Sequence, residues 1–185
     1  MNAEISQPSA PEPKSSRARS LIDRYAMGGP MLAYAVSGLS REQERLRPGP
    51  GDWSIAELVA HLMDTDLVDS DRMKRVIAEE NPVLMGFDES AWVKRLGYQE
   101  ASVEEAVSLL TANRRWTAAI LRRLDDDAFA RVGQHSETGR KSLAELLAIA
   151  VNHVDHHLRF LYVKRSNLGV GILPRYPSEA IPTTY

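Results

Sequence analysis

Helix-start signals recur along this chain, and they constrain its fold more than any other feature. The signal is a serine followed three residues later by Glu or Gln. It stands at Ser40/Gln43, Ser54/Glu57, Ser102/Glu105 and Ser142/Glu145. In such a capping box the serine side chain accepts a hydrogen bond from the third backbone amide, and the Glu or Gln side chain bonds back to the serine amide. The sequence therefore predicts several helices with defined starting points.

Three of these serines open long segments in which apolar residues recur at three- and four-residue spacing. That spacing is the period of an amphipathic α-helix. The segments cover about 54–80, 102–125 and 142–166, and a fourth helical pattern covers 21–39. We expect Gly28-Gly29-Pro30 to loosen or kink this fourth pattern, because proline lacks an amide hydrogen and clashes with the preceding turn.

These segments predict an all-α fold, a four-helix bundle with a long crossover between helices 2 and 3. The links at 81–101 and 126–141 are long enough to cross from one end of a bundle to the other, so helices 2 and 3 can run parallel. No segment alternates apolar and polar residues over the length of a strand, so we expect no sheet. The bundle domain is placed at 18–168, between a disordered tail at 1–17 and an irregular tail at 169–185.

Composition excludes several classes of protein. The 23 basic and 25 acidic side chains give a formal charge of −2, and no basic cluster alternates with aromatic residues, so we expect no nucleic-acid partner. The absence of cysteine excludes disulfides and a cysteine nucleophile. The longest apolar candidate, 143–154, is broken by Glu145, Asn152 and His153 and is too short for a bilayer. We therefore expect a cytoplasmic protein with no membrane partner.

Histidines form the most distinctive polar pattern. His153 and His157 are four residues apart on one predicted helix, so both imidazoles leave the same face and can bind one metal ion. His156 lies near that face at three-residue spacing and stays open as the alternative second ligand. A third imidazole must come from another helix, and His61 lies at the edge of the apolar stripe of 54–80. Periodicity does not place His61 beside the pair, and a histidine at such a position is often simply buried and hydrogen-bonded.

Other polar and aromatic residues have a structural as well as a functional interpretation. Trp53 precedes a capping serine, where packing is favoured over substrate contact. Asp64 lies one turn after His61 and is either solvated, an orienting group for an imidazole, or a general base. Asp155 is expected to point away from the histidine pair, and His135 lies in a glycine-flanked loop where contact with substrate is an open alternative. Packing roles are expected for Trp92, Tyr98 and Trp116.

Three stretches carry a resemblance to a known family. They are 47–64 with its Trp-Ser-x-x-Glu-x-x-x-His element, 133–143 around His135, and 153–158 with its His-x-x-His-His element. Together they resemble the DinB-like superfamily, nearest its YfiT-like branch of metal-dependent hydrolases, over about residues 20–164. The resemblance implies a four-helix bundle. It also implies a divalent metal ion, nickel or zinc, whose three histidine ligands correspond to His61, His153 and His157.

The chemistry of such a centre leaves different classes of function open. Three neutral imidazoles leave coordination positions free, so the ion could activate water in a hydrolase or hold an external thiol in a transferase. The resemblance implies low-molecular-weight thiols as candidate substrates, since members of the superfamily are implicated in their transfer. The alternative is a non-catalytic metal or small-ligand binding module. A small-molecule substrate is expected, a homodimer stays open, and no residue is assigned as catalytic acid or base.

Overall fold

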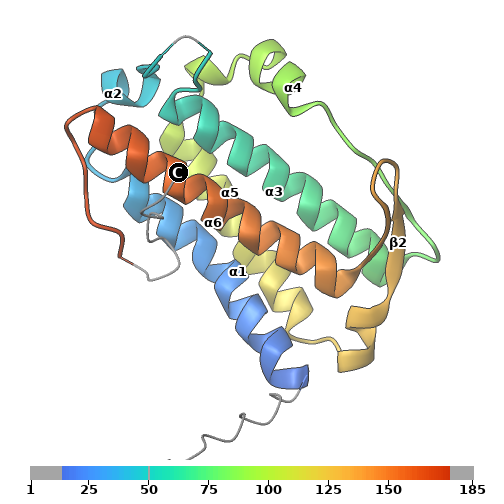
Figure 1. Ribbon diagram of the computed structural model, residues 1–185. Coiled ribbons are helices and arrows are strands. Elements are labelled where there is room, and N and C mark those ends of the chain that lie inside the picture. The colour runs from blue at the N-terminus through green and yellow to red at the C-terminus, as the bar shows by residue number, and fades with distance from the viewer. Residues whose placement is uncertain (1–13, 50, 176–185) are drawn as a thin grey trace, which may run out of the picture.

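The computed structural model describes residues 14–49 and 51–175, and four long helices lie side by side in it (Figure 1). They are α1 (Lys14–Val36), α3 (Ile55–Ala78), α5 (Val103–Leu121) and α6 (Leu143–Asn167). These four helices confirm the predicted bundle. Helix α1 begins four residues before the expected domain start, and the rest of the expected N-terminal tail lies outside the described residues, as does the last part of the C-terminal tail.

The helices begin at the predicted serines. Ser54 and Ser142 form complete capping boxes in front of α3 and α6, and Ser40 forms one in front of the short helix α2 (Arg41–Arg45). Ser102 caps α5 by accepting a hydrogen bond from the Glu105 amide. These bonds satisfy amides that a helix leaves unpaired in its first turn, which explains why the starting points could be read from the sequence.

Two apolar clusters set the direction of the four helices. In the first cluster, the beginnings of α3 and α5 pack against the ends of α1 and α6. In the second, the ends of α3 and α5 pack against the beginnings of α1 and α6. Helices α3 and α5 therefore run parallel to each other and antiparallel to α1 and α6. This arrangement confirms the long crossover between the second and third long helices.

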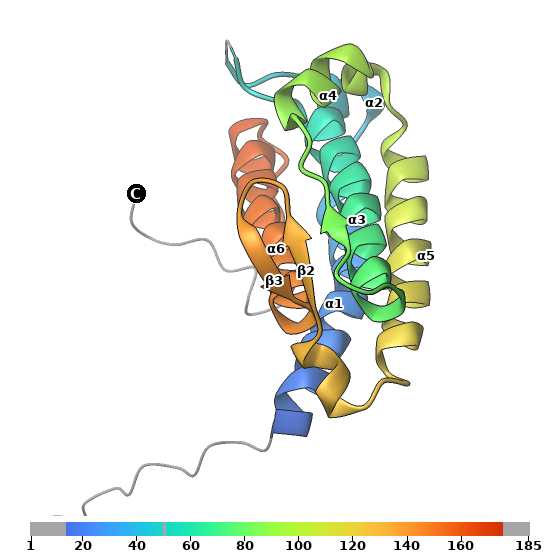
Figure 2. The same ribbon diagram turned by 90° about the vertical axis from the view of Figure 1, so that its right-hand side faces the viewer.

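A small sheet lies outside the bundle, and the expectation of no sheet was wrong. Strand β1 (Val83–Leu84) pairs in parallel with β2 (Val132–His135), and β2 pairs antiparallel with β3 (Gly139–Ser142). Figure 2 shows the β2–β3 hairpin lying against α6 and beside α3, in agreement with their contacts. Strands of two to four residues are too short to show an alternating pattern, so periodicity could not detect them.

The two long links also contain short helical segments. The crossover from α3 to α5 carries α4 (Glu89–Arg95) and the 3₁₀ turn η1 (Tyr98–Glu100), which both contact α3. A second 3₁₀ turn, η2 (Asp126–Ala130), precedes β2. After α6 the chain folds back on the bundle, where the Tyr34 hydroxyl donates to the carbonyl oxygen of Leu173 at 3.0 Å.

Helix α1 continues through the segment where we expected it to loosen or kink. Pro30 lies inside the helix, without an interruption of the helical assignment. The two preceding glycines lie where α1 meets α5. A Cβ atom on Gly28 would lie 2.2 Å from Nη1 of Arg114, and one on Gly29 would lie 2.6 Å from Oγ1 of Thr111. The glycine pair therefore permits a close approach of two helices.

Aromatic side chains only partly follow the expected packing roles. Tyr98 is buried, and the Trp92 ring packs on Phe87 with ring centroids 4.6 Å apart. Trp116 is 66% exposed, so its expected packing role is wrong. The inward face of α5 is occupied by other residues, Thr117 and Ala118 among them, which turns Trp116 outward. No helix in the described part of the chain has both the length and the apolar composition of a membrane span.

Candidate metal centre

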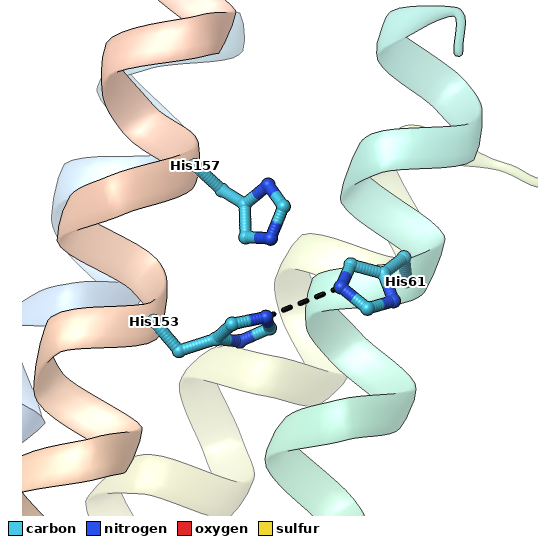
Figure 3. Close-up of side chains that lie close together, drawn as sticks. All are labelled: His61, His153 and His157. Carbon is cyan, nitrogen blue, oxygen red and sulfur yellow. Dashed lines mark hydrogen bonds between the residues drawn. The ribbon is translucent and has the colours of Figure 1, made fainter. Parts of the chain in front are cut away.

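Two facing helices hold the predicted metal ligands. Helix α3 carries His61, and α6 carries His153 and His157, with the three rings turned toward one another (Figure 3). The ring centroid of His61 lies 5.1 Å from that of His153 and 5.0 Å from that of His157, and the latter two are 4.6 Å apart. One nitrogen atom from each ring lies within 4.8 Å of the others. The structure thus brings all three predicted residues together.

The geometry and the donor set fit a divalent ion. Nε2 of His61 and Nε2 of His153 are 3.2 Å apart. Two nitrogen ligands of a tetrahedral zinc ion, each bonded at about 2.0–2.1 Å, lie about 3.3 Å from each other. The other ring nitrogen of His61, Nδ1, is 3.4 Å from Oγ1 of Thr65. A hydrogen bond to this hydroxyl orients the ring and leaves Nε2 for the ion.

Burial keeps the three imidazoles neutral. It lowers the pKa of His153 to about 3, and the neighbouring imidazoles act in the same direction. Burial also lowers the pKa of His157 to about 3 and lowers that of His61, where the charges of Glu89 and Asp64 oppose the effect. Since an imidazole must be neutral to bind a metal ion, the site suits coordination at neutral pH.

The remaining residues of the histidine segment lie elsewhere. His156 is exposed, its ring packs on Phe160 with centroids 4.8 Å apart, and it is not part of the cluster of possible ligands. Asp155 forms an ion pair with Arg24 of α1 at 2.6 Å. The structure therefore turns Asp155 away from the histidines, as expected, and favours the four-residue pair over the alternative with His156.

A cavity of about 180 Å³ adjoins the histidine cluster. Its walls come from α3, the crossover, the β2–β3 hairpin and α6. The lining residues are Thr65, Asp69, Arg72, Gly86, Phe87, Glu89, His135, Glu137, Ile149 and His153. His135, whose contact with substrate was left open by the sequence, thus shares a cavity with one of the three clustered histidines.

Sequence reasoning missed two acidic residues of this site. Oε2 of Glu89, the first residue of α4, lies 4.0 Å from Nε2 of His61. No pattern in the sequence links these two residues, because only the path of the crossover brings them together. Asp69 is buried and pairs with Arg72 at 3.0 Å. Its position eight residues after His61 on the same helix was a usable signal, since residues at that spacing share a helix face.

Two residues with open roles are explained by their contacts. The Trp53 ring packs beside the His61 ring, with centroids 5.0 Å apart, and also contacts the small apolar cluster around Tyr98. Asp64 accepts a hydrogen bond from the Tyr98 hydroxyl. Asp64 therefore anchors η1 to α3, and among the described residues no hydrogen bond links it to an imidazole.

Comparison with known proteins gives the same family. Residues 27–161 match the family described as the DinB superfamily. Two similar proteins bear the name "Putative metal-dependent hydrolase". OB0782 of Oceanobacillus iheyensis is 32% identical over 129 residues, which are 69% of this chain and 74% of that protein. YfiT of Bacillus subtilis is 33% identical over 129 residues, 69% of this chain and 72% of that protein.

Solved structures share the fold. The structure of Bacillus subtilis YfiT, described as having an unusual four-helix bundle topology, superposes with a TM-score of 0.78 and 24% identity over 89% of this chain and 93% of that one. A DinB-like protein, YjoA of Bacillus subtilis, gives a TM-score of 0.60 with 18% identity over 85% of this chain and 96% of that one. By its family match and its relatives, this chain is a member of the DinB superfamily.

Proposed function

We propose that this protein is a divalent-metal-dependent hydrolase that acts on a small molecule. The observation that carries the proposal is the convergence of three neutral imidazoles, from His61, His153 and His157, beside a cavity of about 180 Å³. Such a donor set suits zinc or nickel. The names of the relatives support the same reaction class.

The residues around the cluster have distinct roles in this reaction. A bound divalent ion supplies Lewis acidity, which polarises a carbonyl group and makes water a better nucleophile. Thr65 holds the His61 ring through Nδ1 and so directs Nε2 toward the ion. The Glu89 carboxylate is 4.0 Å from that Nε2, and its side chain is 51% exposed. We assign Glu89 to accept the proton of the attacking water, because a general base must lie within reach of that water and be able to release the proton to solvent.

Two other functions use the same centre and predict different results. A thiol-dependent transferase would show activity only when a small thiol is bound in the cavity. A binding module would have its coordination closed by a fourth protein ligand, and Glu89 is the carboxylate near enough to supply one. The behaviour of a Glu89 variant therefore separates an enzyme from a closed site.

The test begins with metal analysis of protein purified without a histidine tag. Protein loaded with zinc or nickel is then assayed on ester and amide panels, with and without small thiols. We expect metal-dependent hydrolysis without thiol. Glu89→Gln should keep the metal and lower kcat by about 100-fold. His156→Ala is the control and should keep both metal and activity.

Other outcomes point to the other functions. Reaction only in the presence of a thiol would replace the hydrolase with a transferase. Loss of metal from Glu89→Gln, with no activity in any assay, would favour the binding module.

A further inference from the structure

His135 occupies an anchored position at the end of β2. It pairs with Leu84 of β1 and with Gly139 of β3. The Ser136 amide donates to the carbonyl oxygen of Leu84 at 3.0 Å, and the Gly86 amide donates to Oγ of Ser136 at 2.9 Å. Leu84 itself is buried in the second apolar cluster. The sheet thus fixes His135 relative to the bundle and to the histidines of α3 and α6.

The hairpin turn determines which ring nitrogen of His135 carries the proton. The backbone amides of Glu137 and Thr138 donate to Nδ1 of His135 at 3.2 and 3.4 Å. A ring nitrogen that accepts hydrogen bonds has no proton of its own, so in the neutral ring the proton is on Nε2. Burial lowers the pKa of His135, with Arg72 and Lys141 acting in the same direction and Glu137 opposing them. The ring is therefore neutral, with one N–H to donate.

The other side-chain donors that line the cavity already have hydrogen-bond partners. Arg72 already donates to Asp69 and to the carbonyl oxygen of Met85. Thr65 is engaged with His61, and the remaining charged groups of the lining are carboxylates, which accept when ionised. Nε2 of His135 has no hydrogen-bond partner within the described ranges 14–49 and 51–175.

We propose that His135 binds substrate by donating its Nε2–H to an oxygen atom, in the cavity that it lines together with His153 of the three-histidine cluster. The inference rests on the proposed function and adds a substrate class to it. The substrate is a small molecule with two oxygen-bearing groups, one at the three-histidine centre and one at His135. Since His135 and His153 line the same cavity of about 180 Å³, one small molecule in it can reach both groups.

The first test measures the tautomer of His135 in the metal-free protein. Long-range proton–nitrogen NMR spectra distinguish a proton on Nε2 from one on Nδ1, and His135→Gln identifies the signal. We expect the Nε2–H form, whose nitrogen signal shifts when succinamate is added. A proton on Nδ1 would overturn the proposal.

The second test measures binding of small carboxylates to cobalt-loaded protein by visible absorption. Acetate has one oxygen-bearing group, whereas malonamate and succinamate add an amide carbonyl at two different distances. Wild-type protein should bind malonamate or succinamate more tightly than acetate. His135→Ala should lower that ratio of affinities about tenfold, which is the value of one such hydrogen bond. His135→Gln should keep part of the preference, because its amide can still donate. Gln134→Ala, on the same strand but outside the cavity, is the matched control.

The two proposals fail in different ways. An unchanged preference in His135→Ala, with cobalt bound, would overturn the role of His135 and leave the metal centre intact. Failure of the protein to bind cobalt would overturn the proposed function. The NMR test on the metal-free protein, which measures the His135 tautomer and its response to succinamate, would then decide by itself whether His135 is a donor.

Discussion

Helix α3 contributes to two buried polar clusters that differ in how completely the protein satisfies them. On the side of α5, the Asp66 carboxylate accepts hydrogen bonds from Nε of Arg114 at 2.7 Å and from the side-chain Nδ2 of Asn113 at 2.7 Å. Arg114 also donates to the carbonyl oxygens of Ala150 at 2.8 Å and Tyr25 at 3.1 Å. The two charged side chains of this Asp66–Arg114 cluster are thus hydrogen-bonded to each other and to further protein groups.

The histidine cluster on the side of α6 is not completed in this way. Nε2 of His61 and Nε2 of His153 face each other at 3.2 Å, where two neutral rings can share one proton at most. Nδ1 of His157 is buried without a hydrogen-bond partner among the described residues. Buried polar groups are costly unless they are bonded. The difference indicates that the first cluster stabilises the fold, whereas the second is arranged for a group that the protein does not itself provide.

The largest expected effect of a single substitution comes from breaking the Asp66–Arg114 cluster. Arg114→Met leaves the Asp66 carboxylate buried without its counter-charge, at a site where burial already raises the pKa of Asp66. We expect a loss of about 3–5 kcal/mol in the free energy of unfolding, measured by urea denaturation. The double variant Asp66→Leu/Arg114→Met should recover most of the loss, since neither charge remains. A loss below about 1 kcal/mol in the single variant would contradict the comparison.

Adding metal should complete the second cluster and produce the next largest effect. Zinc at a free concentration 100 times its Kd should stabilise the native protein by about 2.7 kcal/mol. Alanine in place of His61, His153 or His157 should abolish this gain and remove the metal, as measured by thermal unfolding and elemental analysis. His156→Ala should retain both, because its ring lies outside the cluster. Equal losses in all four variants would show that the effect is not specific to the three-histidine site.

Acid should destabilise the metal-free protein through the same histidines. The folded-state pKa of His153 and His157 is about 3, below the ordinary value of about 6.5, so the unfolded chain binds more protons between these values. Stability is therefore full above pH 6.5 and falls as the pH drops toward 3, with a slope approaching about 1.4 kcal/mol per pH unit for each histidine.

Asp69 acts in the opposite direction. Burial raises its pKa to about 6, so its contribution to stability increases as the pH falls below that value. The effect of the two histidines is therefore measured as the difference in the free energy of unfolding between the metal-free wild type and His153→Gln/His157→Gln across the same pH range. If the free energy of unfolding of the two proteins changes with pH in the same way, the predicted effect of the histidines is wrong.

The smallest expected effect concerns the ion pair that lies beside the histidine segment. Arg24 and Asp155 are 22% and 18% exposed, against 2% and 1% for Arg114 and Asp66, so solvent screens the attraction of the first pair more than that of the second. Asp155→Asn should change the free energy of unfolding by less than about 1 kcal/mol and leave the metal content unchanged. Urea denaturation and elemental analysis check both values. A loss as large as that of Arg114→Met would remove the distinction between this pair and the buried one.

Much of the bundle was predictable because its signals are local. Ser54 and Ser142 begin α3 and α6 through bonds to residues three positions away. The pairing of His153 with His157 follows from helix geometry alone. Local signals were weak or ambiguous elsewhere. The strands of the small sheet are too short for a pattern, and the glycines before Pro30, which suggested a loosened or kinked helix, allow close packing of α1 on α5.

The sequence by itself determined where the long helices begin, which of their faces are apolar, and that two histidines of one helix share a face. Periodicity could not place His61 beside that pair, and only the resemblance to the family implied it. The tertiary structure brings His61 to the pair across a separation of 92 residues from His153, and it alone decided that Glu89 and His135 reach the same cavity. The physical reason is range. Caps and periodicity depend on neighbours within a few residues, whereas the site depends on how the long crossover and the hairpin close against α3 and α6, and no local pattern encodes that closure.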